Sequence, residues 1–364
     1  ELLSLVIILA GAVLVGLVLM LLAYLFTRDS LSRYDLPEGQ RFSPADATAV
    51  AASAAAVKAL NKRLRGASGP LEKMPWSERI HSMRETMDTF FAGAETSSVI
   101  TPVDAAGVPA EWVVAPGADC SRRFLYIHGG AFMAGSPKGY RVLTDKLSEI
   151  TNSAVLAIDY RLMPENKRLD CVEDCRTSYD WMLENGPQGL DASAPSAVFV
   201  AGDSAGGNLT LVLLAWIRDT QRAAPNAALA LSPVTDARFV SPSIRGNLES
   251  DVILRPLAKR LAWVPGFLIG LAGRFMAGHK ASDPVVSPLL GDLAGLPPIL
   301  VLASDCEILR DDGRRYVNKA VEAGTDARLM LWDNVPHVWP IFYPDLPEAA
   351  EALEQVDMFF KRHS

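Results

Sequence analysis

The chain has 364 residues, of which 49% are hydrophobic and 21% charged, and its formal net charge is −7. This length exceeds one minimal domain but suits a single large α/β domain with added helices. A negative chain lacks the basic footprint that polyanions require, so we expect no nucleic-acid partner. The chain has four cysteines, Cys120, Cys171, Cys175 and Cys306, which are too few and too scattered for a disulfide framework. Cys171 and Cys175 lie four residues apart, but no further Cys or His pair completes a zinc site.

Residues 2–26 form an almost continuous apolar stretch. As a helix at about 1.5 Å per residue they would extend over roughly 37 Å, more than the ~30 Å of bilayer hydrocarbon. A cleaved signal peptide is the alternative, but the apolar run is long and no small-residue cleavage pattern follows it. We therefore predict a transmembrane helix over residues 1–26, with the lipid bilayer as a partner. Arg28, Arg33 and Arg41 follow the span and favour a cytoplasmic catalytic domain, although acidic residues are interspersed.

Two helices are predicted between this stretch and the first strand. Residues 27–42 are polar and contain Pro37 and Gly39, which favours a juxtamembrane linker. Residues 43–46, Ser-Pro-Ala-Asp, are typical of a helix start with proline in the first helical position, and an alanine-rich run follows to about Arg65. A second helix is predicted over residues 75–91. Both belong to a segment, residues 43–95, that either caps the domain or lies along the membrane.

From about residue 110 the chain alternates short apolar runs with helical stretches. This alternation predicts an α/β fold with a mostly parallel central sheet and helices on both faces. The segment 111–114 is the first strand-like run, and the further candidate strands are Phe124–Ile127, Ala154–Ile158, Ala197–Ala201, Ala228–Leu231, Ile299–Leu302 and Arg328–Leu331.

The alternation stops over residues 235–282, which we interpret as an insertion. Leu254, Leu257, Leu261 and Val264 recur at spacings of three and four, which predicts an amphipathic helix. A second apolar stretch, residues 267–276, follows and is too short to span a bilayer. The insertion is either a cap that covers the core or a surface that dips into the membrane, and the sequence favours neither.

A G-x-S-x-G sequence stands between a predicted strand and a predicted helix. Residues 202–207, Gly-Asp-Ser-Ala-Gly-Gly, follow the apolar run that ends at Ala201 and precede the helical run that begins at Asn208. In that context the pattern predicts a nucleophile elbow, whose tight turn requires very small flanking residues. Ser204 would then sit at a helix N-terminus, where the helix dipole and free N–H groups favour a developing anion. We predict that Ser204 is a catalytic nucleophile.

An acyl-transfer serine also needs hydrogen-bond donors for the oxyanion. Residues 128–132, His-Gly-Gly-Ala-Phe, follow the strand-like run that ends at Ile127, so they occupy a neighbouring loop. We predict that the N–H groups of Gly129, Gly130 and Ala205 form the oxyanion hole. His128 is expected to hold the loop by hydrogen bonds.

The serine hydroxyl needs a base, and histidine has a suitable pKa. Among the five histidines, His337 is the one that follows the last predicted strands in a loop. In α/β-hydrolases the triad follows the order serine, acid, histidine, which also favours His337 as the base. The acid should then follow the strand that ends near Ala303. Spacing alone leaves Asp305 and Glu307 open, while later acids look like the first turn of a helix.

Three segments together resemble the hormone-sensitive lipase family, the bacterial family IV esterases. They are residues 128–130, residues 160–165 (Tyr-Arg-Leu-Met-Pro-Glu) and residues 202–207, and the resemblance extends over roughly residues 100–362. In that family the catalytic acid opens a D-P-L-x-D-[DE] segment. Residues 307–312, Glu-Ile-Leu-Arg-Asp-Asp, are similar to it with Glu in the first place. The resemblance therefore implies Glu307 as the acid, with Asp305 as the fallback.

The resemblance implies an α/β-hydrolase domain over residues 43–364. The N-terminal helices and the insertion 235–282 would then form a lid over the acyl and alcohol pockets. The sequence departs from the family at Ala131, where many members have a third glycine, and at Ile308, where many have proline. Neither departure removes a catalytic group.

These observations favour a membrane-anchored serine carboxylesterase that acts on hydrophobic esters of short to medium acyl length through an acyl-enzyme. No metal or organic cofactor is expected. An amidase or deacetylase with the same machinery is an alternative. A ligand-binding component of a membrane complex is another, although such relatives have a disabled triad and His337 is intact. A membrane-protein partner and a homo-oligomer both stay open.

Overall fold

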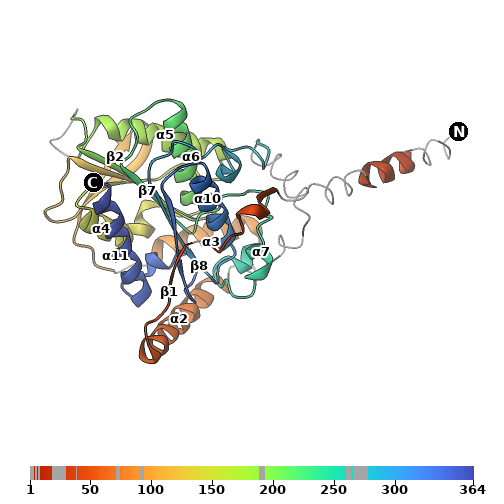
Figure 1. Ribbon diagram of the computed structural model, residues 1–364, viewed down its shortest axis with the longest axis horizontal. Helices are drawn as coiled ribbons and strands as arrows, with labels where there is room; N and C mark the ends of the chain where they lie inside the picture. Colours follow the sequence, from red (N-terminus) through yellow and green to blue (C-terminus); the bar gives the residue numbers. More distant parts are fainter. Residues whose placement is uncertain are drawn as a thin grey trace.

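A computed structural model describes residues 4, 6, 9–18, 30–37, 39–70, 74–90, 94–187, 193–259, 264 and 278–364. Within these residues the centre of the molecule is one nine-stranded sheet in the order β1-β9-β8-β7-β6-β4-β5-β3-β2 (Figure 1). The strands are β1 (Gln40–Phe42), β2 (Val99–Ala105), β3 (Val108–Val114), β4 (Arg122–Ile127), β5 (Ala154–Ile158), β6 (Ala197–Asp203), β7 (Ala227–Leu231), β8 (Ile299–Ser304) and β9 (Ala327–Trp332).

Most neighbouring strands in this sheet are parallel. The antiparallel pairs are β2 with β3 and β3 with β5, and every other pair is parallel. The strands from β4 to β8 are buried almost throughout, because helices cover both faces of the sheet. This is why they appear in the sequence as uninterrupted apolar runs, and the predicted α/β fold with a mostly parallel sheet is confirmed.

Two layers of helices sandwich the sheet. The helices α4 (Arg141–Thr151) and α11 (Pro347–Arg362) pack on one face, and α5 (Arg168–Glu184), α6 (Ala205–Asp219) and α10 (Arg310–Glu322) pack on the other (Figure 1). The remaining helical elements are η1 (Ser30–Tyr34), α2 (Ala47–Ser68), α3 (Trp76–Thr89), η3 (Pro137–Tyr140), α7 (Ser243–Gly246), α8 (Arg255–Ala258), η4 (Pro288–Leu290) and η5 (Trp339–Phe342).

The segment predicted as a juxtamembrane linker, residues 27–42, is part of the folded domain where the structure describes it. Leu31 and Tyr34 of η1 are buried, and they join the apolar cluster around α10. Strand β1 then pairs with β9 in parallel and extends the sheet by one strand. The linker prediction is therefore wrong for residues 30–37 and 39–42. Leu31 and Tyr34 pack against the domain, and residues 40–42 form a strand of its sheet.

The predicted membrane localisation is also wrong. Among the residues that the structure describes, we find no helix that is both long and apolar enough to cross a bilayer. Residues 1–3, 5, 7, 8 and 19–26 of the predicted span lie outside the described residues. We do not retain the anchor, the bilayer as a partner or the cytoplasmic orientation.

The predicted cap helices correspond to α2 and α3, with a different start for α2. Asp46 is the N-cap residue, and its carboxylate accepts from the N–H groups of Thr48 and Ala49, so Pro44 lies before the helix. In the insertion, α8 covers a short part of the predicted helix over residues 254–264. Residues 260–263 of that helix and all of residues 265–277 lie outside the described residues.

Candidate active site

Ser204 lies at the turn between β6 and α6. Its backbone has φ 51° and ψ −111°, a left-handed conformation that side chains rarely adopt and that the surrounding packing must enforce. A Cβ on Gly206 would lie 2.0 Å from the carbonyl oxygen of Ile127, and a Cβ on Gly202 would lie 2.4 Å from the carbonyl oxygen of Gly206. The turn therefore needs glycine at both positions, as predicted for a nucleophile elbow.

Three predicted residues meet in one hydrogen-bonded row. Nε2 of His337 lies 3.0 Å from Oγ of Ser204, and Nδ1 of His337 lies 2.5 Å from Oε2 of Glu307. Because a carboxylate only accepts, Nδ1 carries the hydrogen and Nε2 is left to accept from the serine hydroxyl. The other oxygen of Glu307 accepts from the N–H of Ser304 at 2.8 Å, which fixes the carboxylate. Ser204, Glu307 and His337 follow the carboxyl ends of the parallel strands β6, β8 and β9, which lie at the same end of the sheet.

Glu307 determines the basicity of this imidazole. Burial alone would lower the pKa of His337. The hydrogen bond and the charge of Glu307, together with the charges of Asp251 and Asp203, outweigh burial, and the pKa is raised above its usual value. His337 is 4% exposed and Glu307 is fully buried, so solvent does little to weaken the pair.

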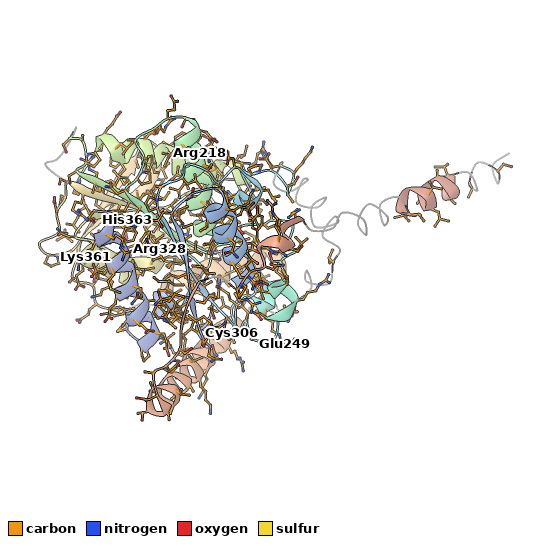
Figure 2. All side chains as sticks on the ribbon, in the orientation of Figure 1. Arg218, Glu249, Cys306, Arg328, Lys361 and His363 are labelled. Atoms are coloured by element: carbon orange, nitrogen blue, oxygen red, sulfur yellow. The ribbon has the colours of Figure 1, made fainter. Side chains whose placement is uncertain are left out.

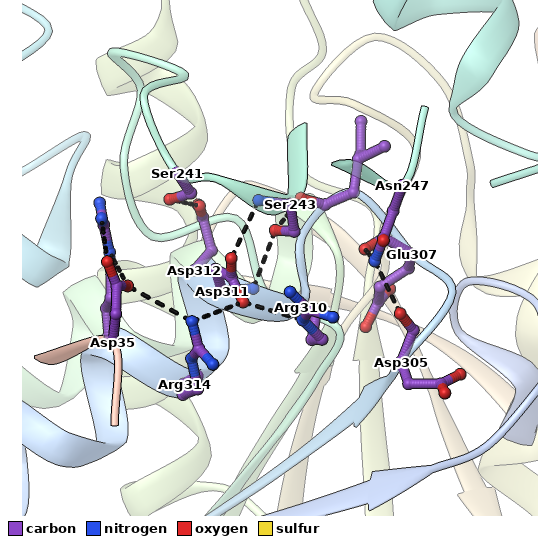
Figure 3. A network of polar contacts seen from close by, with 12 residues as sticks. Asp35, Ser241, Ser243, Asn247, Asp305, Glu307, Arg310, Asp311, Asp312 and Arg314 are labelled. Carbon is purple, nitrogen blue, oxygen red and sulfur yellow. Dashed lines mark hydrogen bonds and ion pairs between the residues drawn. The ribbon is translucent and has the colours of Figure 1, made fainter. Parts of the chain in front are cut away.

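Asp305, the fallback acid, points elsewhere. Its carboxylate lies 3.3 Å from Nη2 of Arg41 and accepts from the N–H of Asn334 at 2.9 Å. In the close-up of this loop, Asp305 extends away from the Glu307 carboxylate (Figure 3). Glu307 therefore contacts His337, whereas Asp305 contacts Arg41 and the backbone of Asn334.

The oxyanion loop differs from the prediction at one residue. The N–H of Gly129 donates to Oδ1 of Asp203 at 2.7 Å, so this donor is already used. Gly130 and Ala131 line the pocket beside Ser204, with φ of 109° and 55°. Between described residues, no hydrogen bond is donated by the N–H groups of Gly130, Ala131 or Ala205. We therefore replace Gly129 by Ala131 as a candidate donor and keep Gly130 and Ala205.

Asp203 is a site residue that the sequence analysis missed. It is 2% exposed and accepts from the N–H of Gly129 and the hydroxyl of Tyr126 through Oδ1, and from the hydroxyl of Tyr140 through Oδ2. Burial raises its pKa to about 6, although the hydrogen bonds act in the opposite direction. No sequence pattern marks this role, because it depends on two tyrosines from distant segments.

His128 holds the oxyanion loop, as predicted. Its Nδ1 lies 2.7 Å from the carbonyl oxygen of Gly129, and its ring stacks on Tyr160 with centroids 4.4 Å apart. The hydroxyl of Tyr160 donates to the carbonyl oxygen of His128. Burial lowers the pKa of His128 to about 4, so this imidazole is neutral near pH 7.

An apolar cavity of about 240 Å³ opens above Ser204. Its walls come from α2, α3, the oxyanion loop, the segment before and within α8, and the segment after His337. The predicted cap segments therefore both contribute to the pocket. The apolar lining residues include Leu64, Met83, Met87, Phe90, Tyr140, Ile253, Leu254, Leu257, Val338, Ile341 and Phe342.

Among the described residues, no group of three or more His, Cys, Asp or Glu side chains is arranged to hold a metal ion. All four cysteines are free thiols, and Cys171 and Cys175 are buried in α5. The fold and the site together thus define the class of the protein as a hydrolase of the α/β type.

Comparisons with known proteins agree with this class. The family described as alpha/beta hydrolase fold matches residues 124–341. An acetyl-hydrolase of Streptomyces hygroscopicus is 35% identical over 252 residues, 69% of this chain and 79% of that protein. An esterase of Acinetobacter venetianus is 31% identical over 260 residues, 71% of this chain and 81% of that protein. The crystal structure of an esterase from the bacterial hormone-sensitive lipase (HSL) family is 31% identical, with a TM-score of 0.72, over 85% of this chain and 98% of that chain.

The chain therefore belongs to the alpha/beta hydrolase fold family. Its similarity to esterases of the hormone-sensitive lipase type further identifies it as a carboxylic ester hydrolase.

Proposed function

We propose that the protein is a serine carboxylesterase that cleaves hydrophobic esters of short to medium acyl length through an acyl-enzyme. The observation that carries this proposal is the hydrogen-bonded row of Glu307, His337 and Ser204 at the floor of an apolar cavity. A hydroxyl next to an oriented imidazole is the arrangement that activates a serine nucleophile.

In the first half of the reaction, Oγ of Ser204 bonds to the ester carbonyl carbon while Nε2 of His337 takes the hydroxyl proton. The carbonyl oxygen becomes an oxyanion, which the N–H groups of Gly130, Ala131 and Ala205 would stabilise. The bond to the alcohol oxygen then breaks, and the imidazolium returns its proton to the leaving alcohol. Glu307 stays ionised and stabilises the imidazolium by their hydrogen bond.

In the second half, a water molecule attacks the acyl-enzyme and gives its proton to His337. The acid leaves and Ser204 regains its proton, so atoms and protons balance over the cycle.

The substrate class follows from the cavity. Its lining is mostly apolar and its volume is about 240 Å³, which favours a hydrophobic group of limited length. A structure similar to this chain, of an esterase soaked with p-nitrophenyl butyrate, is 32% identical with a TM-score of 0.71. We expect p-nitrophenyl esters of short to medium acyl chains to be cleaved faster than long-chain esters. A strong preference for long chains would overturn this part of the proposal.

Labelling with a fluorophosphonate tests the nucleophile. Wild type should be labelled and Ser204→Ala should not, since the reagent bonds to the activated hydroxyl.

Glu307→Ala should lower kcat by about 10³-fold or more, while Asp305→Ala should lower it by less than about tenfold. A larger loss in Asp305→Ala would show that the acid is misassigned. Matched ester and anilide substrates separate an esterase from the amidase alternative.

A further inference from the structure

The loop that carries Glu307 is held by a segment of the insertion. We call residues 243–251 the tether segment. Nδ2 of Asn247 donates to the carbonyl oxygens of Asp305 at 2.7 Å and Glu307 at 2.8 Å. The hydroxyl of Ser250 donates to the carbonyl oxygen of Cys306 at 2.8 Å. Figure 2 shows Glu249 and Cys306 together on one side of the molecule, and Figure 3 shows the Asn247 contacts.

At the end of the tether segment, one carboxylate contacts two parts of the site. Oδ1 of Asp251 accepts from the N–H groups of Ile253 at 3.1 Å and Leu254 at 2.8 Å. Oδ2 accepts from the N–H of Ile308 at 2.9 Å. Ile253 and Leu254 line the cavity above Ser204, and Ile308 directly follows Glu307. Asp251 therefore bridges the pocket wall and the loop of the candidate acid.

The bridge is buried and backed by apolar packing. Asp251 is 2% exposed, so water does not compete for its hydrogen bonds. Behind it, Ile308 and Leu309 pack into one cluster with side chains on both sides of Asp251: Ile244, Leu248 and Ala258. Close-packed groups of this kind transmit displacements, because they have little free volume to absorb them.

We propose that Asp251 is a positioning residue that couples the pocket wall, residues 253–257, to the carboxylate of Glu307. A group that fills the cavity presses on this wall, and the displacement reaches the loop of Glu307 through Asp251 and so adjusts the orientation of His337. The proposal rests on the proposed function, because it assumes that Glu307 orients the catalytic imidazole. Under this proposal, kcat depends on how far the substrate fills the cavity, and Asp251 carries that dependence.

The coupling requires acceptors on both oxygens of residue 251. A carboxylate supplies them, whereas an asparagine has one acceptor oxygen and one donor NH₂ group. Asp251→Asn can keep the bonds to the pocket wall or the bond to Ile308, but it cannot keep both. We expect this variant to lower kcat for p-nitrophenyl butyrate by about tenfold or more and to change KM by less than about twofold.

A double-mutant cycle with Leu257→Ala measures the coupling itself. Leu257 lines the cavity and has no catalytic group. In wild type, Leu257→Ala should lower kcat by at least about fivefold, and in the Asp251→Asn background by less than about twofold. The two effects would then differ by more than the roughly twofold that independent sites allow. Asn247→Ala is the matched control, because it loosens the loop of Glu307 but leaves the Asp251 bridge intact. The full effect of Leu257→Ala should persist in that background.

The possible outcomes separate the two proposals. If Ser204→Ala still hydrolyses the ester, the proposed function has failed. If Ser204→Ala is inactive but the cycle is additive within about twofold, only the coupling is overturned. A second measurement covers the case in which Asp251→Asn does not fold. Wild type labelled with a hexyl instead of a methyl fluorophosphonate should change amide exchange at Ile308 by at least about threefold, and equal exchange would overturn the coupling.

Discussion

A buried imidazole normally loses basicity, because burial penalises its charged form. At His337 the hydrogen bond and charge of Glu307, together with the negative charges of Asp251 and Asp203, reverse this effect. The structure thus surrounds one candidate base with three buried acidic residues. We infer that the base is tuned by its neighbours and not by contact with solvent.

The pH dependence of activity should report this tuning. His337 must be neutral to accept the serine proton, so kcat/KM should rise as the pH passes through its raised pKa, above the usual value of about 6.5. Glu307→Gln should move this rise to lower pH, because the main group that raises the pKa loses its charge. The measurement is kcat/KM for p-nitrophenyl acetate between about pH 5 and about pH 9. Asp305→Asn is the control, and a rise that stays in place in Glu307→Gln would contradict the prediction.

The two edges of the sheet are built differently. The short strand β1 closes one edge, and Phe42 stacks on Trp332 of β9 with ring centroids 4.1 Å apart and an interplanar angle of 5°. The strand β2 closes the other edge and leaves Val99 69% exposed. A partly buried stacked ring contributes more to stability than an exposed side chain on a similar strand.

Phe42→Ala should therefore lower the free energy of unfolding by about 2 kcal/mol, less than the roughly 3–5 kcal/mol typical of fully buried phenylalanine. Val99→Ala, on the opposite edge, should change it by less than about 0.5 kcal/mol. Urea unfolding followed by tryptophan fluorescence measures both. Equal losses in the two variants would mean that β1 adds little to the sheet.

At the scale of the whole molecule, the N-terminal segment docks on the last third of the chain. Asp35 accepts from Nε of Arg315 at 2.7 Å and from Nη2 at 2.8 Å, next to the buried side chains of η1 (Figure 3 shows Asp35 beside Arg314). Burial would raise the pKa of Asp35, but the hydrogen bonds and charges of Arg315 and Arg314 lower it below the usual 3.8. The ion pair thus joins segments that are far apart in the sequence.

Asp35→Ala should lower the free energy of unfolding by about 1.5–3 kcal/mol at pH 7, as expected for hydrogen bonds to a charged group. Because the folded-state pKa of Asp35 is depressed, this stabilisation is complete above about pH 4 and is lost as the pH falls further. Glu173→Ala, which removes an exposed ion pair with Arg176, should cost less than about 1 kcal/mol. A difference between Asp35→Ala and wild type that does not shrink below about pH 4 would count against the ion pair.

The sequence by itself determined the parts of the protein that depend on local rules. Strands buried on both faces must be continuously apolar, so β4 to β8 could be found from runs of apolar residues. The elbow at Ser204 could be found because its turn tolerates only glycine at two flanking positions. His337 followed from chain order and from elimination among five histidines.

Only the tertiary structure decided the features that depend on contacts between residues far apart in the sequence. Asp305 and Glu307 are two residues apart in one loop, and contacts with Arg41 and Ser304 direct their carboxylates apart. Asp203 turns the N–H of Gly129 away from the pocket through a contact across 74 residues. Strand β2 has alternating exposure and β1 is polar and short, so neither has an apolar run to reveal it.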